Sequence, residues 1–544
     1  MKKIFSFIFI SLNLIFVFAQ KGHFYGGYEA YFQYYQNDDV TNITAPSDKF
    51  RAMNYLSANY SYDFLKAGIQ YEAFVPQALL GFSPDLKGNG LATYYVQLKK
   101  NNWDVTAGYF YDQFGSGLVF RSWEDRQLGI NNSVRGIRVK YKIDDIGDIT
   151  AFTGNQRINF KLSESTLSGI NTDISLSKLI DYQDININAG FSYVNRYQES
   201  QSVNPDLKPY VGSFSSRLSL DTNNFYTNFE YVYKEPDARA SNNVLLDQVL
   251  FDGNAWLLNF GYAKKGIGFN ATFRRLENIQ MYSERLLEGN SFNTGVMNFI
   301  PGLAKQHDFS LANIYVYQAQ PGIFFGEEKV GEIGGQADLF FRIKRKTFLG
   351  GKYGTKIALN FSRWHGLNAR FDYDKKIYRA DFAKPGELYF QDFNVEIRKK
   401  LNKRTKIVLS YIDLIYNKLK LEGEGETVYA GILVGDVEHK FANKQSLRLE
   451  LQHLNTRQDF RNWAAATLEY YFSQSFSAYA TDMYNYGNED KKIHYFNLGM
   501  NYTHERTRLG LSYGRQRGGL LCVGGVCRYV PPSKGFTVNI STSF

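Results

Sequence analysis

After its N-terminus, this sequence has no long apolar segment. Although 44% of its 544 residues are apolar, the mean hydropathy is only -0.37. Beyond residue 18, no stretch approaches the run of about 18 apolar residues that a membrane-spanning helix needs. A helical membrane protein is therefore excluded. A protein that crosses a membrane with strands is not, because every second residue of such a strand faces a wet interior and keeps the hydropathy low.

Cysteine and catalytic motifs are scarce as well. Only two cysteines are present, whereas a zinc site would need two more soft ligands close to them in the sequence. The 7 histidines are scattered, and the signatures of zinc proteases, serine hydrolases and Walker nucleotide-binding loops are absent. We therefore expect no enzyme, and we predict no catalytic residue, no cofactor and no metal ligand.

Aromatic residues, in contrast, are abundant. The 41 tyrosines and 44 phenylalanines make up most of a 17% aromatic share, which favours β structure and suits the aromatic girdles at the two interfaces of a membrane barrel. The formal charge of +10 is spread along the chain without a basic block, so we expect no nucleic-acid partner. The charge indicates instead that the lumen or its rim prefers anions or lipid head groups.

The first 19 residues have the pattern of a cleaved signal peptide. Lys2 and Lys3 precede an apolar run over residues 4–18, and Ala19 stands at the expected cleavage position. A single membrane anchor is the less favoured alternative, because the run is short for a span of about 20 residues and contains the polar residues Ser6, Ser11 and Asn13. We predict export and a mature chain that begins at Gln20. Strands are expected a few residues later, without a separate plug domain before them.

Alternating apolar and polar residues, as in residues 447–452 (LRLELQ), predict strands with one apolar face and one polar face. Short connections, as at 101–102 and 144–146, alternate with long ones, as at 77–90 and 115–133. A membrane barrel has short periplasmic turns and long outer loops, whereas a soluble sandwich has no reason for this alternation. We therefore predict an all-β fold: one antiparallel outer-membrane β-barrel over residues 20–544, with about 24 strands and a range of about 22 to 26.

Further long connections are expected later in the chain, at about 199–210, 236–254, 280–331, 367–387 and 419–427. Residues 280–331, which include the apolar stretch 307–317, are too apolar for a solvated loop. We consider two explanations. Either the segment folds into the lumen or onto a partner as a long loop, or residues 307–317 form a wall strand and the strand count is wrong.

The last ten residues form an amphipathic strand that ends on an aromatic residue. Phe536, Val538, Ile540 and Phe544 share one parity, and polar residues occupy the other. This resembles the closing strand of bacterial outer-membrane barrels. We therefore expect it to pair with the first strand near His23, and we assign Val538, Ile540 and Phe544 to an assembly signal. The expected partners are outer-membrane lipid and the barrel-assembly machinery, with other outer-membrane proteins as further candidates.

The two cysteines flank a Gly-Gly turn. In an exported protein, Cys522 and Cys527 are best interpreted as a disulfide across a hairpin tip. Loop parity assigns the hairpin, residues 518–531, to the outer side as the last outer loop. In the chain-entropy model, so short a loop gains only about 2 to 3 kcal/mol from the cross-link, so its expected use is to fix the shape of that loop. A redox pair more often has C-x-x-C spacing.

The loop over residues 115–133 combines aromatic and charged side chains. Two interpretations remain open: an inward-folded constriction, in which opposed charges select solutes, and an ordered outer loop with internal ion pairs, which we favour. The residues of the possible constriction are Arg121, Trp123, Glu124, Asp125 and Arg126.

Several short motifs carry a resemblance to a known family. Residues 513–519 (YGRQRGG) lead into residues 522–531 (CVGGVCRYVP), and the likeness extends to 114–117 (FGSG), 123–126 (WEDR) and 350–355 (GGKYGT). On these residues the chain resembles a family of uncharacterised outer-membrane barrel proteins from Bacteroidota. The resemblance implies a single-domain outer-membrane barrel, and it brings no activity with it.

Two functions therefore compete at the level of the sequence. The first is a channel for small solutes whose lumen is constricted by inward loops. The second is a non-enzymatic barrel subunit of a larger outer-membrane assembly for secretion, uptake or barrel insertion. A barrel of about 24 strands is wide enough for either an open channel or a plugged lumen.

Overall fold

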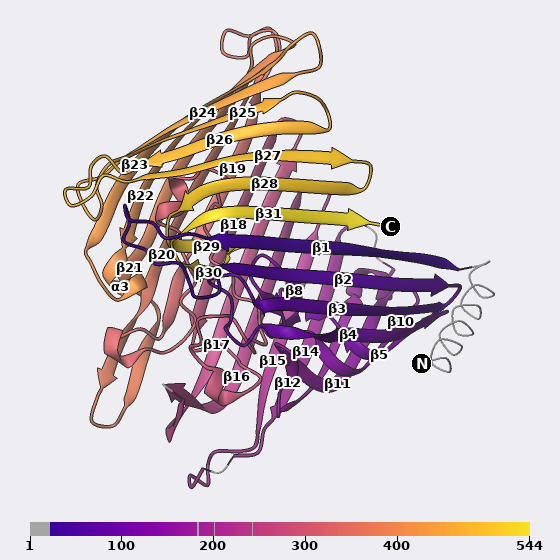
Figure 1. The fold of residues 1–544 in the computed structure, drawn as a ribbon. Coiled ribbons are helices and arrows are strands. Elements are labelled where there is room, and N and C mark those ends of the chain that lie inside the picture. Colours follow the sequence, from indigo (N-terminus) through magenta and orange to yellow (C-terminus); the bar gives the residue numbers. More distant parts are fainter. Residues whose placement is uncertain (1–21, 182–183, 201, 242) are drawn as a thin grey trace.

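The structure, a computed structural model, describes residues 22–181, 184–200, 202–241 and 243–544. The strands form a single antiparallel ring, and the start of its first strand lies beside the end of its last strand on one side of the ring (Figure 1). The predicted signal peptide, residues 1–19, lies outside the described residues. Within the described residues, no helix is long and apolar enough to cross a membrane.

The wall of the ring consists of long strands. Their bounds are β1 His23–Tyr35, β2 Phe50–Tyr62, β3 Leu65–Gln77, β4 Lys87–Lys100, β5 Trp103–Phe110, β10 Val134–Ile143, β11 Gly147–Ile158, β13 Thr166–Ser175, β14 Asn186–Tyr197, β15 Tyr210–Asp221, β16 Phe225–Ser241, β17 Val244–Lys264, β18 Ile267–Glu277, β19 Gly331–Ile343, β20 Thr355–Asp372, β21 Ile377–Lys400, β22 Thr405–Asn417, β23 Thr427–Lys440, β24 Ser446–Asn455, β25 Trp463–Tyr471, β26 Phe476–Tyr484, β27 His494–His504, β28 Thr507–Gln516 and β31 Ser533–Ser543.

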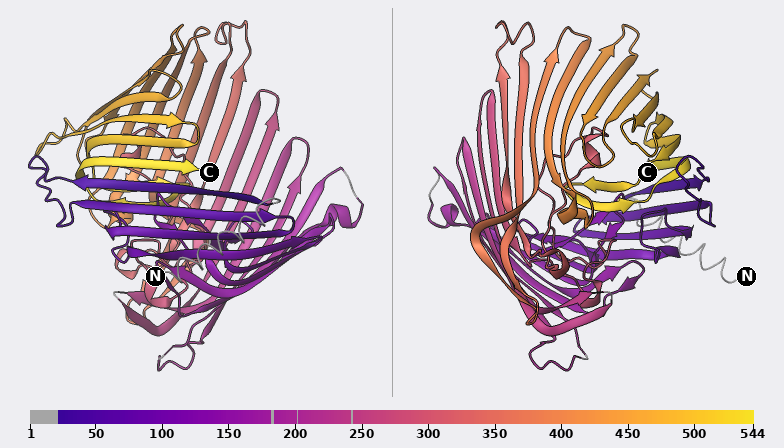
Figure 2. Two further views of the ribbon diagram at one scale, coloured as in Figure 1. Left: turned by 45° about the vertical axis from the view of Figure 1, so that its right-hand side comes forward. Right: turned by 90° about the vertical axis from the view of Figure 1, so that its left-hand side faces the viewer.

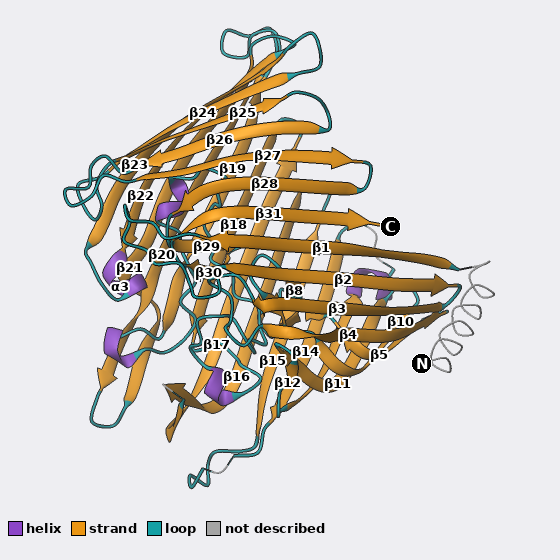
Figure 3. Ribbon diagram, viewed as in Figure 1, coloured by secondary structure: helices purple, strands orange, loops and turns teal. Residues whose placement is uncertain are grey.

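The remaining elements lie in the connections between wall strands. They are the short strands β6 Asp112–Phe114, β7 Phe120–Ser122, β8 Glu124–Asp125, β9 Ile130–Asn131, β12 Lys161–Leu162, β29 Gly519–Val523 and β30 Val526–Val530, the helices α2 Leu176–Leu179 and α3 Lys418–Glu422, and the 3-10 turns η1 Arg285–Leu287, η2 Ala312–Ile314 and η3 Phe325–Glu327. Figure 3 shows how small the helical part is beside the strands.

The ring is closed by its first and last strands. β1 pairs with β2 on one side and with β31 on the other, in a register that sets Ala30 opposite Ile540 and Tyr34 opposite Phe536. The closed barrel has 24 strands, while the two-residue β12 pairs only with β11, outside the ring. The predicted fold class and strand number are confirmed, and the last strand closes the barrel against β1.

The two faces of the wall differ as the alternating sequence predicts. In β22 and β24, Leu409, Tyr411 and Leu451 are exposed on the outer face, whereas Ser410 and Glu450 are buried on the inner one. Because each wall strand is paired on both sides, its backbone needs no water, and an apolar outer face can lie in lipid. Most connections at the end where β1 begins and β31 finishes are short turns, and most connections at the other end are longer loops. This is an outer-membrane β-barrel.

Two of the predicted long loops are wrong. The expected loops at 236–254 and 367–387 are instead the outer ends of long strand pairs, β16 with β17 and β20 with β21. The prolines and glycines that suggested loops lie at register shifts: β16 shifts between Lys234 and Asp237, around Pro236, and Pro385 of β21 pairs with Leu367 beside another shift. A bulge leaves residues unpaired, so it accommodates a proline without ending the strand.

The core of the protein lies inside the loop-side half of the barrel, where several connections turn inward (Figure 2). Side chains there are buried, and the inner wall carries two large apolar clusters among its buried polar residues. In the turn-side half, polar inner side chains such as Arg508, Asn539 and Ser541 remain exposed. The lumen is therefore filled on the loop side and wet on the turn side.

The terminal residue contributes to ring closure. Phe544 exchanges two backbone hydrogen bonds with Gly26, at 3.0 and 3.1 Å, and its ring stacks on Phe24 at 6.1 Å between centroids. We predict that Phe544→Ala lowers the amount of folded barrel in outer membranes, because it weakens the closing seam and the expected assembly signal. The measurement is the heat-modifiable band of unboiled against boiled membrane samples. Phe348→Ala, in the turn at 344–354 where the side chain is 99% exposed, is the matched control. Equal amounts of both variants would show that Phe544 has no such role.

Candidate functional site

Three connections fill the loop-side half of the lumen. We call them inner loop A (residues 111–133, between β5 and β10), inner loop B (residues 278–330, between β18 and β19) and the cysteine hairpin (residues 517–532, between β28 and β31). Inner loops A and B each carry apolar residues that pack against apolar side chains of the inner wall, and Cys527 and Val530 of the hairpin are buried.

Inner loop A packs against the inner faces of β5 to β18. Its residues Phe114, Leu118, Val119 and Phe120 are at most 3% exposed, and Phe120 stacks on Phe152 of β11 at 4.7 Å. Further wall residues of this cluster are Phe110, Val134, Leu167, Val194, Val232, Ala255 and Leu276. A fully buried large apolar side chain contributes about 1.5 to 3 kcal/mol, so the cluster strongly favours the inward position of the loop.

Close backbone approach also holds inner loop A to the wall. Gly115 has φ +56°, and a Cβ at this position would lie 2.5 Å from Cδ of Arg217 and 2.8 Å from Oε1 of Glu230. Next to it, the backbone N–H of Ser116 donates to Glu230 at 3.1 Å. The FGSG motif therefore serves as the contact between this loop and the charged inner wall.

The predicted constriction residues lie in this loop, and two of their four charges, those of Glu124 and Arg126, pair with each other. Arg126 contacts Glu29 of β1 at 2.9 Å and Glu124 at 3.4 Å, while Asp125 accepts the backbone N–H of Leu128 at 2.9 Å. Arg121 lies over the rings of Trp123 and Phe299, at 4.7 and 4.0 Å. The ion pairs match the favoured interpretation, but the loop lies inside the lumen and not on the outer surface. The reason is the apolar stretch that precedes these charges.

Inner loop B covers the opposite part of the wall. Leu311, Tyr315 and Tyr317 are at most 3% exposed and pack on inward residues of β20 to β25. Three hydrogen bonds fix the position: Nε1 of Trp364 donates to the carbonyl of Leu303 at 2.6 Å, the N–H of Leu311 donates to Gln452 at 2.9 Å, and the hydroxyl of Tyr315 donates to Asp459 at 3.0 Å. Residues 307–317 contain no wall strand, only the turn η2.

Buried ion pairs at the loop-side ends of the strands anchor inner loop B at both of its ends. Near its end, Glu332 of β19 pairs with Arg274 of β18 at 2.6 Å and accepts the N–H of Gln320 at 2.7 Å and the hydroxyl of Tyr317. Near its start, Arg285 donates to Asp237 of β16 at 2.7 Å, and that carboxylate also pairs with Arg196 of β14. The sequence does not distinguish these residues, because a polar residue at an inward position is ordinary in a barrel.

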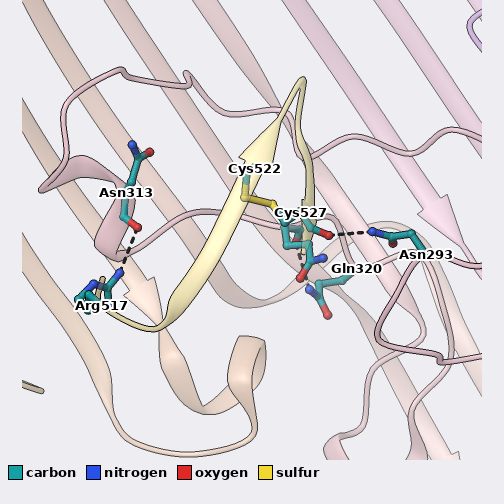
Figure 4. The surroundings of a disulfide bond; sticks show 7 residues. Asn293, Asn313, Gln320, Arg517, Cys522 and Cys527 are labelled. Carbon is teal, nitrogen blue, oxygen red and sulfur yellow. Dashed lines mark hydrogen bonds between the residues drawn. A yellow bond between two sulfur atoms is a disulfide. The ribbon is translucent and has the colours of Figure 1, made fainter. Parts of the chain in front are cut away.

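The cysteine hairpin lies between the two inner loops. The predicted disulfide between Cys522 and Cys527 is present, and the Cys527 carbonyl accepts a hydrogen bond from Asn293 at 2.9 Å (Figure 4). The carbonyl of Gly525 accepts the N–H of Gly302 at 2.7 Å. Arg528 donates to the carbonyl of Gln127 at 2.7 Å and lies 3.9 Å above the ring of Phe82.

The cysteine hairpin does not form the outer loop that the alternation of short and long connections predicts. Cys527 is only 2% exposed, and the hairpin folds inward from the end of β28. A Cβ on Gly525 would meet Pro301 at 2.6 Å, so the second glycine of the turn is required for contact with inner loop B. The Gly-Gly pair alone predicts a turn, but it does not reveal that another backbone approaches it.

Two cavities flank the cysteine hairpin. The outer cavity, of about 540 Å³, is lined by both inner loops and by Gly525, Val526 and Cys527 of the hairpin. The inner cavity, of about 340 Å³, is lined by inner loop B, by wall residues such as Asp392 and Ile412, and by Leu520, Leu521 and Cys522. Opposite sides of one hairpin therefore border two separate cavities. Among the described residues, no group of three or more His, Cys, Asp or Glu side chains could hold a metal ion.

Comparisons with known proteins give a family but no activity. The model of a family described as "Family of unknown function (DUF6029)" matches residues 1–544, and no curated protein matches the chain. Similar solved structures include the translocation pore of the P pilus usher PapC, at 8% identity over 96% of this chain and 99% of that one, with a TM-score of 0.44. A mutant of the ferric enterobactin receptor PfeA from Pseudomonas aeruginosa matches at 10% identity over 96% and 80%, with a TM-score of 0.44. The copper transporter OprC matches at 10% identity over 96% and 81%, with a TM-score of 0.40. Matches at this level transfer no function.

The Glu332 anchor can be tested by substitution. We predict that Glu332→Ala lowers the free energy of unfolding by about 3 to 5 kcal/mol, because it leaves the guanidinium of Arg274 buried without its carboxylate. Urea unfolding of the purified barrel in detergent measures the change. The control is Glu505→Ala in the exposed turn before β28, for which a change within about 0.5 kcal/mol is expected. If both variants unfold alike, the ion pair does not anchor the loop.

Acid should loosen inner loop B at His307. Nε2 of this ring donates a hydrogen bond to Oδ1 of Asn394 at 2.7 Å, and burial lowers the pKa of His307 to about 4, with Lys305 adding to the effect and Asn394, Glu396 and Asp308 opposing it. A released loop would titrate near the ordinary value of about 6.5. The docked state therefore loses stability as the pH falls from that value towards 4, since only the released state takes up the proton.

Hydrogen exchange of residues 303–317 at pH 7.5 and pH 5 measures this release. Because intrinsic amide exchange is base-catalysed and much slower at pH 5, each observed rate is divided by the intrinsic rate at that pH, and lower protection at pH 5 is expected in the wild type. His307→Gln, which keeps a polar amide but cannot become charged, should remove the difference. A pH dependence that persists in this variant would assign the effect to another group.

Proposed function

The chain belongs to the family of unknown function DUF6029 over its whole length, and no activity comes with that family. From the geometry of the lumen, we propose that the protein is a channel for small solutes. Its own inner loops keep this channel closed at rest. The origin of the family in Bacteroidota stays a prediction from the sequence motifs. The proposal assigns no catalytic role to any residue.

The observation that carries this proposal is the series of two cavities inside the ring. The outer cavity lies among the long loops, the inner cavity lies beneath the cysteine hairpin, and the turn-side half of the lumen is lined by exposed polar residues. A barrel that served only as a scaffold would have no need for compartments in series. A solute path through these compartments is interrupted by the cysteine hairpin, which borders both cavities.

The wall of the turn-side half suits small polar solutes. Its inward charges form pairs and clusters, for example Arg138 with Asp104 at 3.1 Å and Arg448 with Asp436, Glu450 and Glu469 at 2.5 to 3.1 Å. Paired charges of both signs offer hydrogen bonds without a large field of one sign, so this region favours hydrated polar solutes over one class of ion.

A subunit of a larger outer-membrane assembly is the second candidate. The observation that favours it is the extension of β16–β17 and β20–β21 beyond the rest of the wall. The extensions pack together through Phe251 and Tyr378, stacked at 5.7 Å, yet Tyr373 and Phe382 remain 55% and 60% exposed. Exposed aromatic residues on a projecting hairpin are suited to contact with another protein.

Conductance in planar bilayers tests the channel. We expect low conductance for the wild-type barrel and a several-fold higher conductance when residues 518–531 are replaced by a short Gly/Ser linker, because the barrier between the cavities is then removed. The control is deletion of residues 489–491 in the β26–β27 loop, which borders neither cavity. A hairpin variant that is folded but no more conductive than wild type would contradict the channel. Recovery of an ion-tight barrel with stoichiometric partners from gently solubilised membranes would favour the assembly.

A further inference from the structure

The outer cavity has the chemistry of a ligand site. Its volume of about 540 Å³ falls in the range of about 300 to 1,000 Å³ that is typical of small-molecule sites. Its lining combines aromatic rings with side-chain amides, and it opens among the connections on the loop side of the barrel. The polar and aromatic side chains of the lining are Trp123, Asn132, Arg239, Ser241, Gln280, Tyr282, Glu288, Asn290, Asn293, Asn298, Phe299, Gln318, Gln320, Phe324 and Lys329.

The charged side chains at this cavity are already neutralised. Arg239 pairs with Glu288 at 3.4 Å. Lys329 pairs with Glu327 and donates to the carbonyl of Lys420 at 2.6 Å and to Gln320 at 3.3 Å. A charged ligand would have to break one of these pairs or remain without a counter-charge, which is costly in a partly buried site. The site therefore favours an uncharged ligand.

The amides fall into two groups. The first group makes hydrogen bonds within the protein, as in the bonds from Asn298 to the carbonyls of Leu118 and Ile279 at 3.1 and 2.9 Å. Its members are Asn132, Asn290, Asn293, Asn298 and Gln320. Within the part of the chain that the structure describes, the side-chain amides of Gln280 and Gln318 make no hydrogen bond to protein. Each offers one acceptor and two donors to a ligand.

Flat apolar surfaces complete the site. The ring of Phe324 is 52% exposed, and Trp123 packs edge to face against Phe299 at 5.6 Å, with its indole N–H unpaired among the described contacts. A hydroxyl group both donates and accepts, as the two glutamine amides do, and a sugar ring also has an apolar face that stacks on an aromatic ring. These features occur together in few uncharged molecules other than saccharides.

We propose that the outer cavity binds a short neutral oligosaccharide, with Gln280 and Gln318 on its hydroxyl groups and Phe324 against a sugar face. The cavity is the outer compartment of the proposed channel. The inference rests on that proposed function only for the direction in which the ligand passes. Binding itself does not require conduction. The ligand would bind at the barrier formed by the cysteine hairpin, beside Gly525 and Cys527.

The test is calorimetric titration of the purified barrel with a panel of neutral oligosaccharides, acidic oligosaccharides and uncharged tripeptides. We expect saturable binding of neutral oligosaccharides, with affinity at least tenfold lower in the Gln280→Ala/Gln318→Ala double variant and in Phe324→Ala. Gln474→Ala and Phe348→Ala, both exposed in turns on the opposite side of the barrel, are the matched controls and should bind as wild type does. Heat-modifiable migration of each variant verifies that it is folded.

Three results would overturn the inference. They are binding of only the acidic sugars or only the peptides, the absence of binding by every neutral oligosaccharide at millimolar concentration, and unchanged affinity in folded Gln280→Ala/Gln318→Ala and Phe324→Ala variants. The conductance experiment separates this inference from the channel. A barrel that conducts without binding sugars refutes only the ligand class, whereas a barrel that binds sugars and stays ion-tight after hairpin replacement refutes only the channel.

Discussion

The interior of this barrel depends on one constraint: apolar side chains on the inner wall must be kept from water. A lumen that were open throughout would expose Trp364, Ile412 and Val428 on one side and Phe152 and Val194 on the other, although all are at most 5% exposed in the structure. Each would cost on the order of 1.5 to 3 kcal/mol if hydrated. Inner loops A and B supply the missing apolar partners. The inward position of both loops is therefore part of the folded core.

Hydrophobic burial determines that the loops turn inward, and the buried ion pairs determine where each loop lies. Glu332 pairs with Arg274 and accepts hydrogen bonds from Tyr317 and from the backbone of Gln320. Asp237 pairs with both Arg196 and Arg285. Replacing one partner of such a pair is costly, whereas the net stability gained from the intact pair is small. Their main effect is thus positional: a loop of 53 residues between β18 and β19 is fixed at both ends, and the cavities between the loops keep a defined lining.

The sequence predicts the wall better than the interior. Alternation, as in residues 447–452, identifies the lipid-facing side of a strand, and loop parity and the C-terminal strand predict an even, closed ring. The same alternation cannot distinguish an inward polar residue that faces water, such as Asn539, from one that anchors a loop, such as Glu332, since both read as polar. The long hairpins were missed at Pro236 and Pro385 because a proline at a bulge and a proline in a loop look alike without the partner strand. The disulfide was predictable from Cys522 and Cys527, but the inward position of its hairpin depends on Gly525, whose neighbour Pro301 is remote in the chain.

The three inner segments are not held equally. Inner loop A is tied to the wall by Arg126 and Glu29, and inner loop B by Arg285 and Asp237. The cysteine hairpin carries Arg517 and Arg528, and within the described residues neither reaches a carboxylate. Arg528 relies on a carbonyl and a ring, with Nη1 unpaired, and burial lowers its pKa to about 10. Displacing the hairpin would rehydrate these guanidinium groups and break no ion pair, whereas displacing inner loop B would take Arg285 from the buried Asp237, and displacing inner loop A would break the pair of Arg126 with Glu29. The disulfide lets the hairpin move as one unit, because it keeps β29 and β30 joined. Of the three segments that close the lumen, the hairpin between the two cavities is therefore the one whose movement costs the least.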